Sequence, residues 1–369
     1  MKLNDVVDRI KGNVDRFTTD LEYYIGGEHF ESNELEITQK GDLKASLGVL
    51  GFKFHFAFQP RDVVFMARNP HLRKAGMVNF SGLCSDASYI LRSKDENVLS
   101  QDYLAAMLQS DHFWDYCDSH KVGSVNFANN WSSIANYEFD LPPIEYQRDL
   151  ASKVWAAYRV KQSYKKLLAA TDEMVKSRFI EMFGNPVTNT KTWPTAKISE
   201  VAPESPCTNP EEGSSWLLNL DMIESHTGKI IEKVYADSGN MLSVLAFDEG
   251  NVLYSKLRPY LNKVVIPDGR GWATTELIPL RPDLKRLNKV FFCALLRSDT
   301  FVSFANSIAT GTKMPRMPMN DLRNFKVILP PLELQNEFER IYNQADKSGF
   351  ELRKSIESID TVIKSLINN

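Results

Sequence analysis

The chain has 369 residues, of which 43% are hydrophobic and 25% are charged, and its formal net charge is −3. This composition is typical of a globular protein with two or three domains, and the charge argues against a strongly basic chain that binds nucleic acid by itself. The sequence contains neither an apolar run of membrane-spanning length nor a signal-peptide pattern, which predicts a cytoplasmic protein with no membrane association. Cys84, Cys117, Cys207 and Cys293 form no Cys-x-x-Cys pair, so we expect buried thiols rather than disulfides or a zinc site.

Residues 1–142 have the pattern of a mixed α+β domain. Short runs that alternate apolar with polar residues, or that are rich in β-branched and aromatic residues, predict strands. The expected strands cover residues 49–56, 62–66, 87–91 and 137–141. Apolar residues near helical spacing from Gln101 to Cys117 predict one helix. Pro142 and Pro143 would end the last strand and set an extended entry into the next helix.

Residues 143–186 predict the first of two long helices. No proline or glycine occurs from Ile144 to Met182, and apolar or small residues recur at alternating steps of four and three. This seam consists of Leu150, Val154, Ala157, Tyr164, Leu168, Thr171 and Val175. Lys161 interrupts it, and Gly184 with Pro186 is expected to end the helix. At the usual rise per residue, the helix would be about 55 Å long.

Residues 187–330 repeat the mixed domain, and residues 331–369 predict the second long helix. The expected elements of the domain are strands at residues 215–218, 251–254 and 263–266 and a helix at residues 289–304. The seam of the second helix is more regular than the first. It consists of Phe338, Tyr342, Ala345, Leu352, Ile356, Ile359, Ile363 and Leu366. Gly349 lies on this seam at the position equivalent to Lys161 on the first. The apolar seams of both helices are therefore expected to be weakest at equivalent positions.

Nearly the same seven residues begin both long helices. Leu141-Pro142-Pro143-Ile144-Glu145-Tyr146-Gln147 returns 188 positions later as Leu329-Pro330-Pro331-Leu332-Glu333-Leu334-Gln335. At the same offset Gly123-Ser124 matches Gly311-Thr312, so the chain is two tandem copies of one unit.

Helices with so little apolar surface are not stable alone in water. The sequence therefore predicts an α+β fold in which two tandem mixed α/β domains are separated by two long helices. These helices would form an antiparallel coiled coil, with the two copies at opposite ends and related by a pseudo-two-fold axis. The alternative is that each helix packs only on its own domain.

Motifs of catalysis are missing from the sequence. It has no glycine-rich phosphate loop, no His-Glu-x-x-His and no nucleophile elbow, and its six histidines show no metal-ligand spacing. We therefore expect a non-catalytic chain that holds neither a cofactor nor a metal.

Basic residues interleaved with aromatic ones recur at matching places in both copies. Lys and Arg contact phosphates, and Arg with Asn or Gln contacts base edges. The candidate nucleic-acid-binding residues are Lys53, His55, Arg68, His71, Arg73 and Lys74 in the first copy and Lys256, Arg258, Tyr260, Lys263, Lys313 and Arg316 in the second. Each of them alone could equally be a solvated loop residue, and only their recurrence favours binding.

Along its whole length the chain resembles the specificity subunits of type I restriction-modification systems. The resemblance rests on the twice-used Leu-Pro-Pro-[Ile/Leu]-Glu-x-Gln motif, on Met182-Phe183-Gly184-Asn185-Pro186, on the Arg258–Lys263 run and on Gly311-Thr312. It implies two target-recognition domains, each of which reads half of a bipartite site in double-stranded DNA. It further implies that the two helices set the spacing and dock two modification subunits. Methylation, the S-adenosylmethionine site and cleavage would then belong to the partner modification and restriction subunits.

The first copy departs from the family pattern. Gly123-Ser124 replaces Gly-Thr, and Asn69-Pro70-His71 replaces Arg-Pro-Tyr, which leaves the contact role of that loop open. Two other functions compete with DNA recognition. A methyltransferase or nuclease would need the catalytic motifs that are missing. A tandem scaffold that pairs two protein partners without reading DNA would share the helices but not the basic loops.

Overall fold

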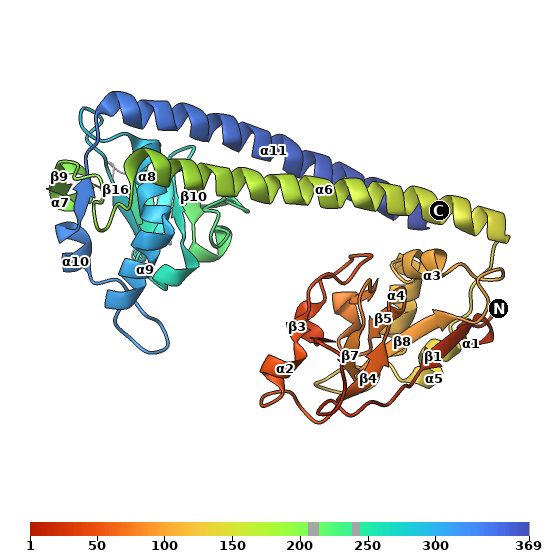
Figure 1. Ribbon diagram of the computed structural model, residues 1–369. Helices are drawn as coiled ribbons and strands as arrows, with labels where there is room; N and C mark the ends of the chain where they lie inside the picture. Colours follow the sequence, from red (N-terminus) through yellow and green to blue (C-terminus); the bar gives the residue numbers. More distant parts are fainter. Residues whose placement is uncertain (206–213, 238–243, 369) are drawn as a thin grey trace. The chain divides into compact units, whose positions relative to one another are not determined.

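The computed structural model of the chain describes residues 1–205, 214–237 and 244–368 (Figure 1). The chain divides into two compact units, one formed by Met1–Lys166 with Leu352–Asn369 and the other by Leu167–Glu351. Each unit contains one globular domain and part of both long helices. We call residues 1–142 the first domain and residues 187–330 the second domain, and the predicted boundaries at 142, 186 and 330 stay a prediction.

The first domain is built from two sheets of four strands each. Its strands are β1 (Val7–Ile10), β2 (Tyr23–Ile25), β3 (Gly41–Asp42), β4 (Phe54–Phe58), β5 (Val63–Met66), β6 (Ala75–Met77), β7 (Gly82–Ser85) and β8 (Ser88–Ser93). Its helical elements are α1 (Leu3–Val6), η1 (Gly27–His29), α2 (Leu43–Ser46), η2 (Pro70–Leu72), α3 (Gln101–Met107), α4 (Asp111–Ser119) and α5 (Trp131–Ala135). One sheet has the order β1-β8-β5-β6 and the other β3-β2-β7-β4, in which β2 and β7 are parallel.

The second domain repeats this plan. Its strands are β9 (Thr195–Lys197), β10 (Ser214–Leu218), β11 (Val234–Asp237), β12 (Val244–Phe247), β13 (Val252–Ser255), β14 (Val264–Val265), β15 (Gly271–Thr274), β16 (Leu277–Leu280) and β17 (Lys326–Ile328). Its helical elements are α7 (Ile198–Val201), η3 (Leu220–Met222), η5 (Pro259–Leu261), α8 (Lys289–Arg297), α9 (Asp299–Ile308) and α10 (Met319–Asn324). The sheets have the orders β14-β13-β16, β11-β10-β15-β12 and β17-β9, and β10 pairs with β15 in parallel as β2 does with β7.

Strand β5 shows how the sequence builds two cores, one on each face of a sheet. Successive side chains of a strand point to opposite faces. Val63 and Phe65 lie in an apolar cluster with side chains of α1, α3 and α4, whereas Val64 and Met66 lie in a second cluster with side chains of the other sheet. Because both faces are buried, the strand is apolar throughout and does not alternate with polar residues.

The two long helices, α6 (Ile144–Phe183) and α11 (Leu332–Asn368), run antiparallel to each other. In the first unit, Val154 near the start of α6 shares an apolar cluster with Ile363 near the end of α11. In the second unit, Phe179 near the end of α6 meets Phe338 near the start of α11, with ring centroids 5.4 Å apart. The predicted antiparallel pair is therefore confirmed. The same clusters contain domain side chains, so the helices pack on the domains as well as on each other.

All the predicted seam residues are buried or half-buried in the structure. The residues that are buried are Val154, Phe338, Ala345 and Ile363, and those that are half-buried are Leu150, Ala157, Tyr164, Leu168, Thr171, Val175, Tyr342, Leu352, Ile356, Ile359 and Leu366. Neither helix breaks at Lys161 or Gly349.

Lys161, which interrupts the seam, is only 5% exposed and is paired on two sides within the first unit. Its Nζ lies 2.8 Å from Oε1 of Glu34 and 2.6 Å from Oδ1 of Asp360. Lys165 Nζ also donates to Glu34, at 2.9 Å. Burial alone would raise the pKa of Glu34, but the hydrogen bonds and charges of Lys161 and Lys165 bring that pKa below its ordinary value of 4.5. A position that looks like a defect in the seam thus joins the first domain to both helices.

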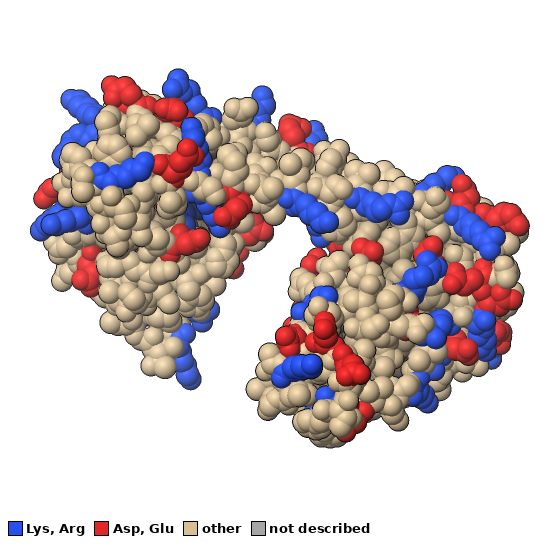
Figure 2. Space-filling model, in the orientation of Figure 1, with Lys and Arg blue, Asp and Glu red and all other residues tan. Residues whose placement is uncertain are grey.

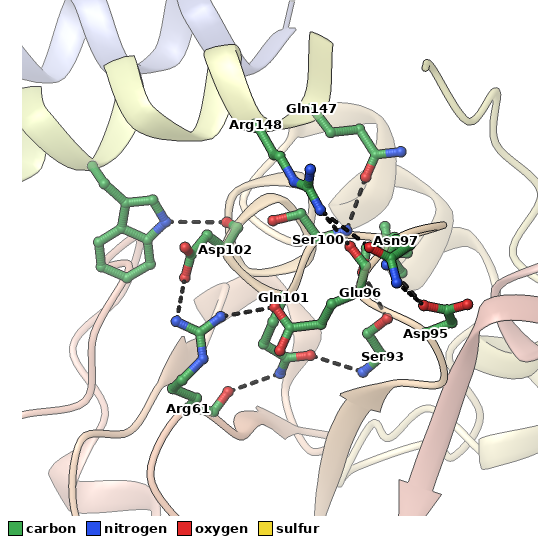
Figure 3. A network of polar contacts seen from close by, with 12 residues as sticks. Arg61, Ser93, Asp95, Glu96, Asn97, Ser100, Gln101, Asp102, Gln147 and Arg148 are labelled. Atoms are coloured by element: carbon green, nitrogen blue, oxygen red, sulfur yellow. Dashed lines mark hydrogen bonds and ion pairs between the residues drawn. The ribbon is translucent and has the colours of Figure 1, made fainter. Parts of the chain in front are cut away.

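The glutamine that ends the repeated motif anchors α6 to the first domain. Gln147 is fully buried, and its Oε1 accepts a hydrogen bond of 3.0 Å from the backbone N–H of Ser100 (Figure 3). Its Nε2 donates to the carbonyl oxygens of Val98 at 2.9 Å and Pro142 at 2.8 Å. One side chain therefore satisfies three backbone groups at the junction of the helix, the proline turn and the loop before α3.

Gln335 makes the same three bonds one repeat later. Its Oε1 accepts from the N–H of Asn288 at 2.8 Å, and its Nε2 donates to the carbonyls of Arg286 at 3.1 Å and Pro330 at 2.8 Å. The motif recurs because both copies need this connection, and the two prolines place the glutamine at the first turn of the helix.

Two expected strands of the first domain differ from the structure. The strand expected at residues 49–56 begins only at Phe54, because Val49 lies in a turn and is 87% exposed. The strand expected at residues 137–141 is reduced to one bridge between Glu138 and Lys2. In the second domain the equivalent segment does form a strand, since β17 pairs with β9 there.

The helices expected at residues 101–117 and 289–304 are each split in two by a serine. Ser110 Oγ accepts from the N–H of Phe113 at 3.2 Å, and Ser298 Oγ accepts from the N–H of Phe301 at 3.3 Å. Each serine therefore caps a new helix, α4 or α9, instead of continuing the previous one.

Three cysteines are buried free thiols, as predicted: Cys84, Cys117 and Cys293. Burial raises the pKa of Cys84 to about 12, so this thiol stays protonated. Cys207 lies outside the described residues. Over residues 1–205, 214–237 and 244–368, no helix is both long and apolar enough to cross a membrane.

Candidate nucleic-acid interface

Both domains contain a short 3₁₀ turn that is enclosed by two left-handed residues. Asn69 (φ 52°) and Arg73 (φ 49°) enclose η2, and Arg258 (φ 49°) and Asn262 (φ 48°) enclose η5. The left-handed conformation costs little for asparagine but about 1 kcal/mol or more for arginine. The two copies carry these residues in opposite order, so each turn holds one arginine in a strained backbone conformation.

A second loop pairs with each turn through main-chain hydrogen bonds alone. In the first domain, Asn69 N–H donates to Phe127 O and Asn129 N–H to Ala67 O, both at 2.8 Å. In the second, Arg258 N–H donates to Pro315 O at 2.7 Å and Met317 N–H to Lys256 O at 2.9 Å. We call these two-loop structures the paired loops: residues 67–74 with 122–129, and residues 256–263 with 310–317.

The glycines of the repeated Gly-Ser and Gly-Thr pairs turn the second loop. Gly123 has φ 106° and Gly311 has φ 104°, a conformation that favours glycine. A Cβ added at Gly123 would lie 2.6 Å from the carbonyl oxygen of Asn126. The Gly-Ser departure noted in the first copy therefore leaves the backbone of this loop intact.

In the second domain, the paired loops contain all six predicted residues. Lys256, Arg258, Tyr260 and Lys263 lie on one loop, and Lys313 and Arg316 lie on the other. Tyr260 is 43% exposed, and the Nε of Arg258 is buried with no hydrogen-bond partner among the described residues.

In the first domain, the paired loops hold Arg68 and His71, which are both exposed. Arg73 is half-buried and pairs with Asp111. Lys53 and His55 belong to the other sheet: Lys53 comes just before β4, and His55 lies within it. Lys53 Nζ lies 3.3 Å from Asp86. The turn at Asp86 connects Lys53 with the paired loops. Asp86 N–H donates to the carbonyl of Lys53, and the next residue, Ala87, accepts through its carbonyl from Ala67 N–H.

Lys74 and Lys263 are equivalent and point into their own domains. Lys74 Nζ donates to the carbonyl of Gly27 in η1 at 2.7 Å, and Lys263 Nζ donates to the carbonyl of Leu220 in η3 at 2.6 Å. Burial lowers the pKa of Lys263. Both lysines therefore hold a neighbouring 3₁₀ turn in place, which the sequence pattern alone did not reveal.

A carboxylate that sequence reasoning missed lies among the cations of the second domain. Glu276, in the turn between β15 and β16, accepts from Arg316 Nε at 3.0 Å and from Arg316 Nη2 at 2.9 Å, and Lys256 Nζ lies 4.0 Å away. A pattern of basic and aromatic residues does not include a carboxylate, and Glu276 is 40 residues from Arg316 in the sequence. Only the fold brings them together.

Charges of both signs are mixed over the visible face of each unit (Figure 2). Cations and anions alternate there, in keeping with the net charge of −3. The face shown in Figure 2 is therefore not uniformly basic.

Known proteins resemble the chain in part of its sequence and in all of its fold. No protein-family model matches it. Over 150 residues it is 26% identical to the type I restriction enzyme EcoDI specificity subunit of Escherichia coli, a match that covers 39% of this chain and only 33% of that protein. The S subunit of a type I restriction-modification system from M. genitalium aligns with TM-score 0.58 and 11% identity, covering 100% of this chain and 94% of the other.

A chain from a study of complex assembly and conformational transition in the type I R-M system aligns with TM-score 0.54 and 17% identity, over 100% of this chain and 95% of the other. The chain thus has the fold of type I specificity subunits, and the resemblance inferred from its repeated motifs is confirmed.

Proposed function

We propose that the chain is the sequence-recognition subunit of a type I restriction-modification complex. Each domain reads one half of a bipartite site in double-stranded DNA, and the two helices set the spacing and dock two modification subunits. S-adenosylmethionine binding and methyl transfer belong to the modification subunits and cleavage to restriction subunits, in the cytoplasm where the DNA is.

The paired loops are the observation that supports this function most directly. Both domains build them from the same main-chain hydrogen bonds, and both place exposed basic or aromatic side chains on them. A stiff loop loses little entropy when it enters a groove, and cations beside aromatics suit phosphates and base edges.

The outer face of α6 supports the docking of protein partners. Val160, Leu167 and Met174 are seven residues apart and are 44%, 52% and 46% exposed. Apolar side chains that repeat on one face of a helix and stay in solvent are typical of a protein interface.

Deleting the gene in its own host is expected to abolish methylation at one bipartite DNA motif across the genome. Restoring the gene should restore it, and a gene in which residues 1–142 and 187–330 are exchanged should give the same two half-sites in reversed order. Single-molecule sequencing of modified bases measures all three strains. If the methylation pattern is the same with and without the gene, the chain does not direct a modification subunit.

Replacing Arg258 by asparagine is expected to separate DNA binding from stability. Asparagine already occupies the equivalent left-handed position at Asn69, so the free energy of unfolding should rise by about 1 kcal/mol as the strain is relieved. Loss of the guanidinium should weaken DNA binding by the assembled complex. Urea unfolding and DNA titration measure the two effects, and an unchanged affinity at two salt concentrations would show that Arg258 does not contact DNA.

A further inference from the structure

Three charged side chains of the second domain form one connected group: Lys256 and Arg316 lie on the paired loops, and Glu276 lies in the turn between β15 and β16. Arg316 presents the Nε and Nη2 edge of its guanidinium to Glu276, at 3.0 and 2.9 Å from Oε1. Lys256 Nζ lies 4.0 Å from Oε2 of the same carboxylate. The Arg316 side chain is nevertheless 44% exposed, so the group lies at the surface.

The first domain has alanine at all three equivalent positions. Main-chain bonds define the equivalence: Lys256 N–H donates to Glu276 O as Ala67 N–H does to Ala87 O. Arg316 exchanges two backbone bonds with Thr310 as Ala128 does with Val122. The fold of the paired loops therefore forms without any of the three charges, which removes a structural reason for them.

The geometry leaves one edge of Arg316 available to a ligand. A guanidinium has five donors in a planar fork, and Glu276 uses the edge formed by Nε and Nη2. The remaining edge, formed by Nη1 and the second hydrogen of Nη2, has only a long bond of 3.3 Å from Nη1 to the carbonyl of Met314. Two parallel N–H groups match the O6 and N7 acceptors of guanine in the major groove.

Glu276 prepares Arg316 for this contact. A carboxylate bound to one edge fixes the plane of the guanidinium, so less side-chain freedom is lost when the other edge binds. With Lys256 close to Glu276, the group carries a formal charge of +1, which suits a site against DNA.

We propose that Lys256, Glu276 and Arg316 form a guanine-reading site of the second domain, in which Arg316 contacts the base, Glu276 orients it and Lys256 balances the carboxylate. This inference rests on the proposed function. Because alanines occupy these positions in the first domain, the first half-site is read by other residues.

The test uses the complete complex in its host, with methylated motifs read by single-molecule sequencing. Arg316→Ala should lose about tenfold of the preference for guanine at one position of the half-site read by the second domain. The half-site read by the first domain should not change. Glu276→Gln, which keeps a hydrogen-bond acceptor but removes the charge, should reduce the same preference less.

Arg323→Ala is the matched control. Arg323 forms a similar pair with Glu204, at 2.6 Å from Nε, and is 47% exposed, but it lies on α10 outside the paired loops. Its replacement should leave every position of the motif unchanged. The triple change of Lys256, Glu276 and Arg316 to alanine reproduces the first domain, and should fold and lose the guanine preference as Arg316→Ala does.

The possible outcomes test the guanine-reading site separately from the proposed function. If the unaltered chain directs no methylation of a bipartite motif, the proposed function fails. If it does, and Arg316→Ala and the triple variant keep the full guanine preference, the site is overturned. In DNA titrations of the purified complex, equal weakening of Arg316→Ala on all sequences with a shallower salt dependence would assign Arg316 to phosphate and also overturn the site.

Discussion

Replacing Lys161 by alanine is expected to lower the free energy of unfolding of the first unit by about 3–5 kcal/mol. The replacement leaves the carboxylate of Glu34, which is 6% exposed, with only the more exposed Lys165 as its cationic partner, and it leaves Asp360 without its lysine. Removing one member of a buried ion pair is costly because the remaining charge has lost both water and its partner. Urea unfolding of the full chain, followed by tryptophan fluorescence, measures the change.

The pH dependence of this effect has a definite sign. The pKa of Glu34 is depressed in the folded chain, so the stability that its ion pairs contribute is present above about pH 4.5 and is lost as the pH falls through the lower folded value. The difference between the unaltered chain and Lys161→Ala should therefore shrink below pH 4.5. Lys165→Ala is the control, since Lys165 is 37% exposed and its loss should cost much less. A difference that grew in acid would exclude Glu34 as the cause.

Gln335→Leu is expected to cost about 3 kcal/mol of stability, and Gln147→Leu about the same. Leucine fills similar space but leaves the N–H of Asn288 and the carbonyls of Arg286 and Pro330 without the bonds they have now. A buried backbone group that loses its partner costs more than the bond contributed. Thermal and urea unfolding of the full chain measure the loss.

Gln344→Leu supplies the comparison for both glutamines. It is the same substitution on α11, at an exposed position, and should change stability by less than about 0.5 kcal/mol. If Gln335→Leu were equally mild, the repeated glutamine would not be the anchor of the helix.

The long helices and the repeat could be predicted from the sequence, because they depend on patterns that extend over tens of residues. The breaks at Ser110 and Ser298 could not, since a serine caps a helix only when the backbone before it leaves the helical conformation. The strand expected at residues 137–141 failed because strand formation depends on a partner, and only β17 of the second copy has a full one.

The candidate interface was predictable in composition but not in geometry. The sequence pattern grouped Lys74 and Lys263 with the other candidate DNA-contacting cations. In the structure, both lysines instead donate to carbonyls of their own domains. The pattern of cations does not include Glu276, because only the fold brings this carboxylate into contact with Arg316. Charge signs can be read along a chain, whereas the direction of a side chain depends on tertiary contacts.

Main-chain bonding of the paired loops has a consequence for the side chains that each domain presents. Asn69, Arg258 and their neighbours join the loops through backbone groups, so the bonding itself does not require a particular side chain at positions such as 67, 87 and 128. The first domain holds three alanines where the second holds a charged trio, and the backbone bonds of the paired loops are the same in both. One backbone frame can therefore present different side chains in the two domains.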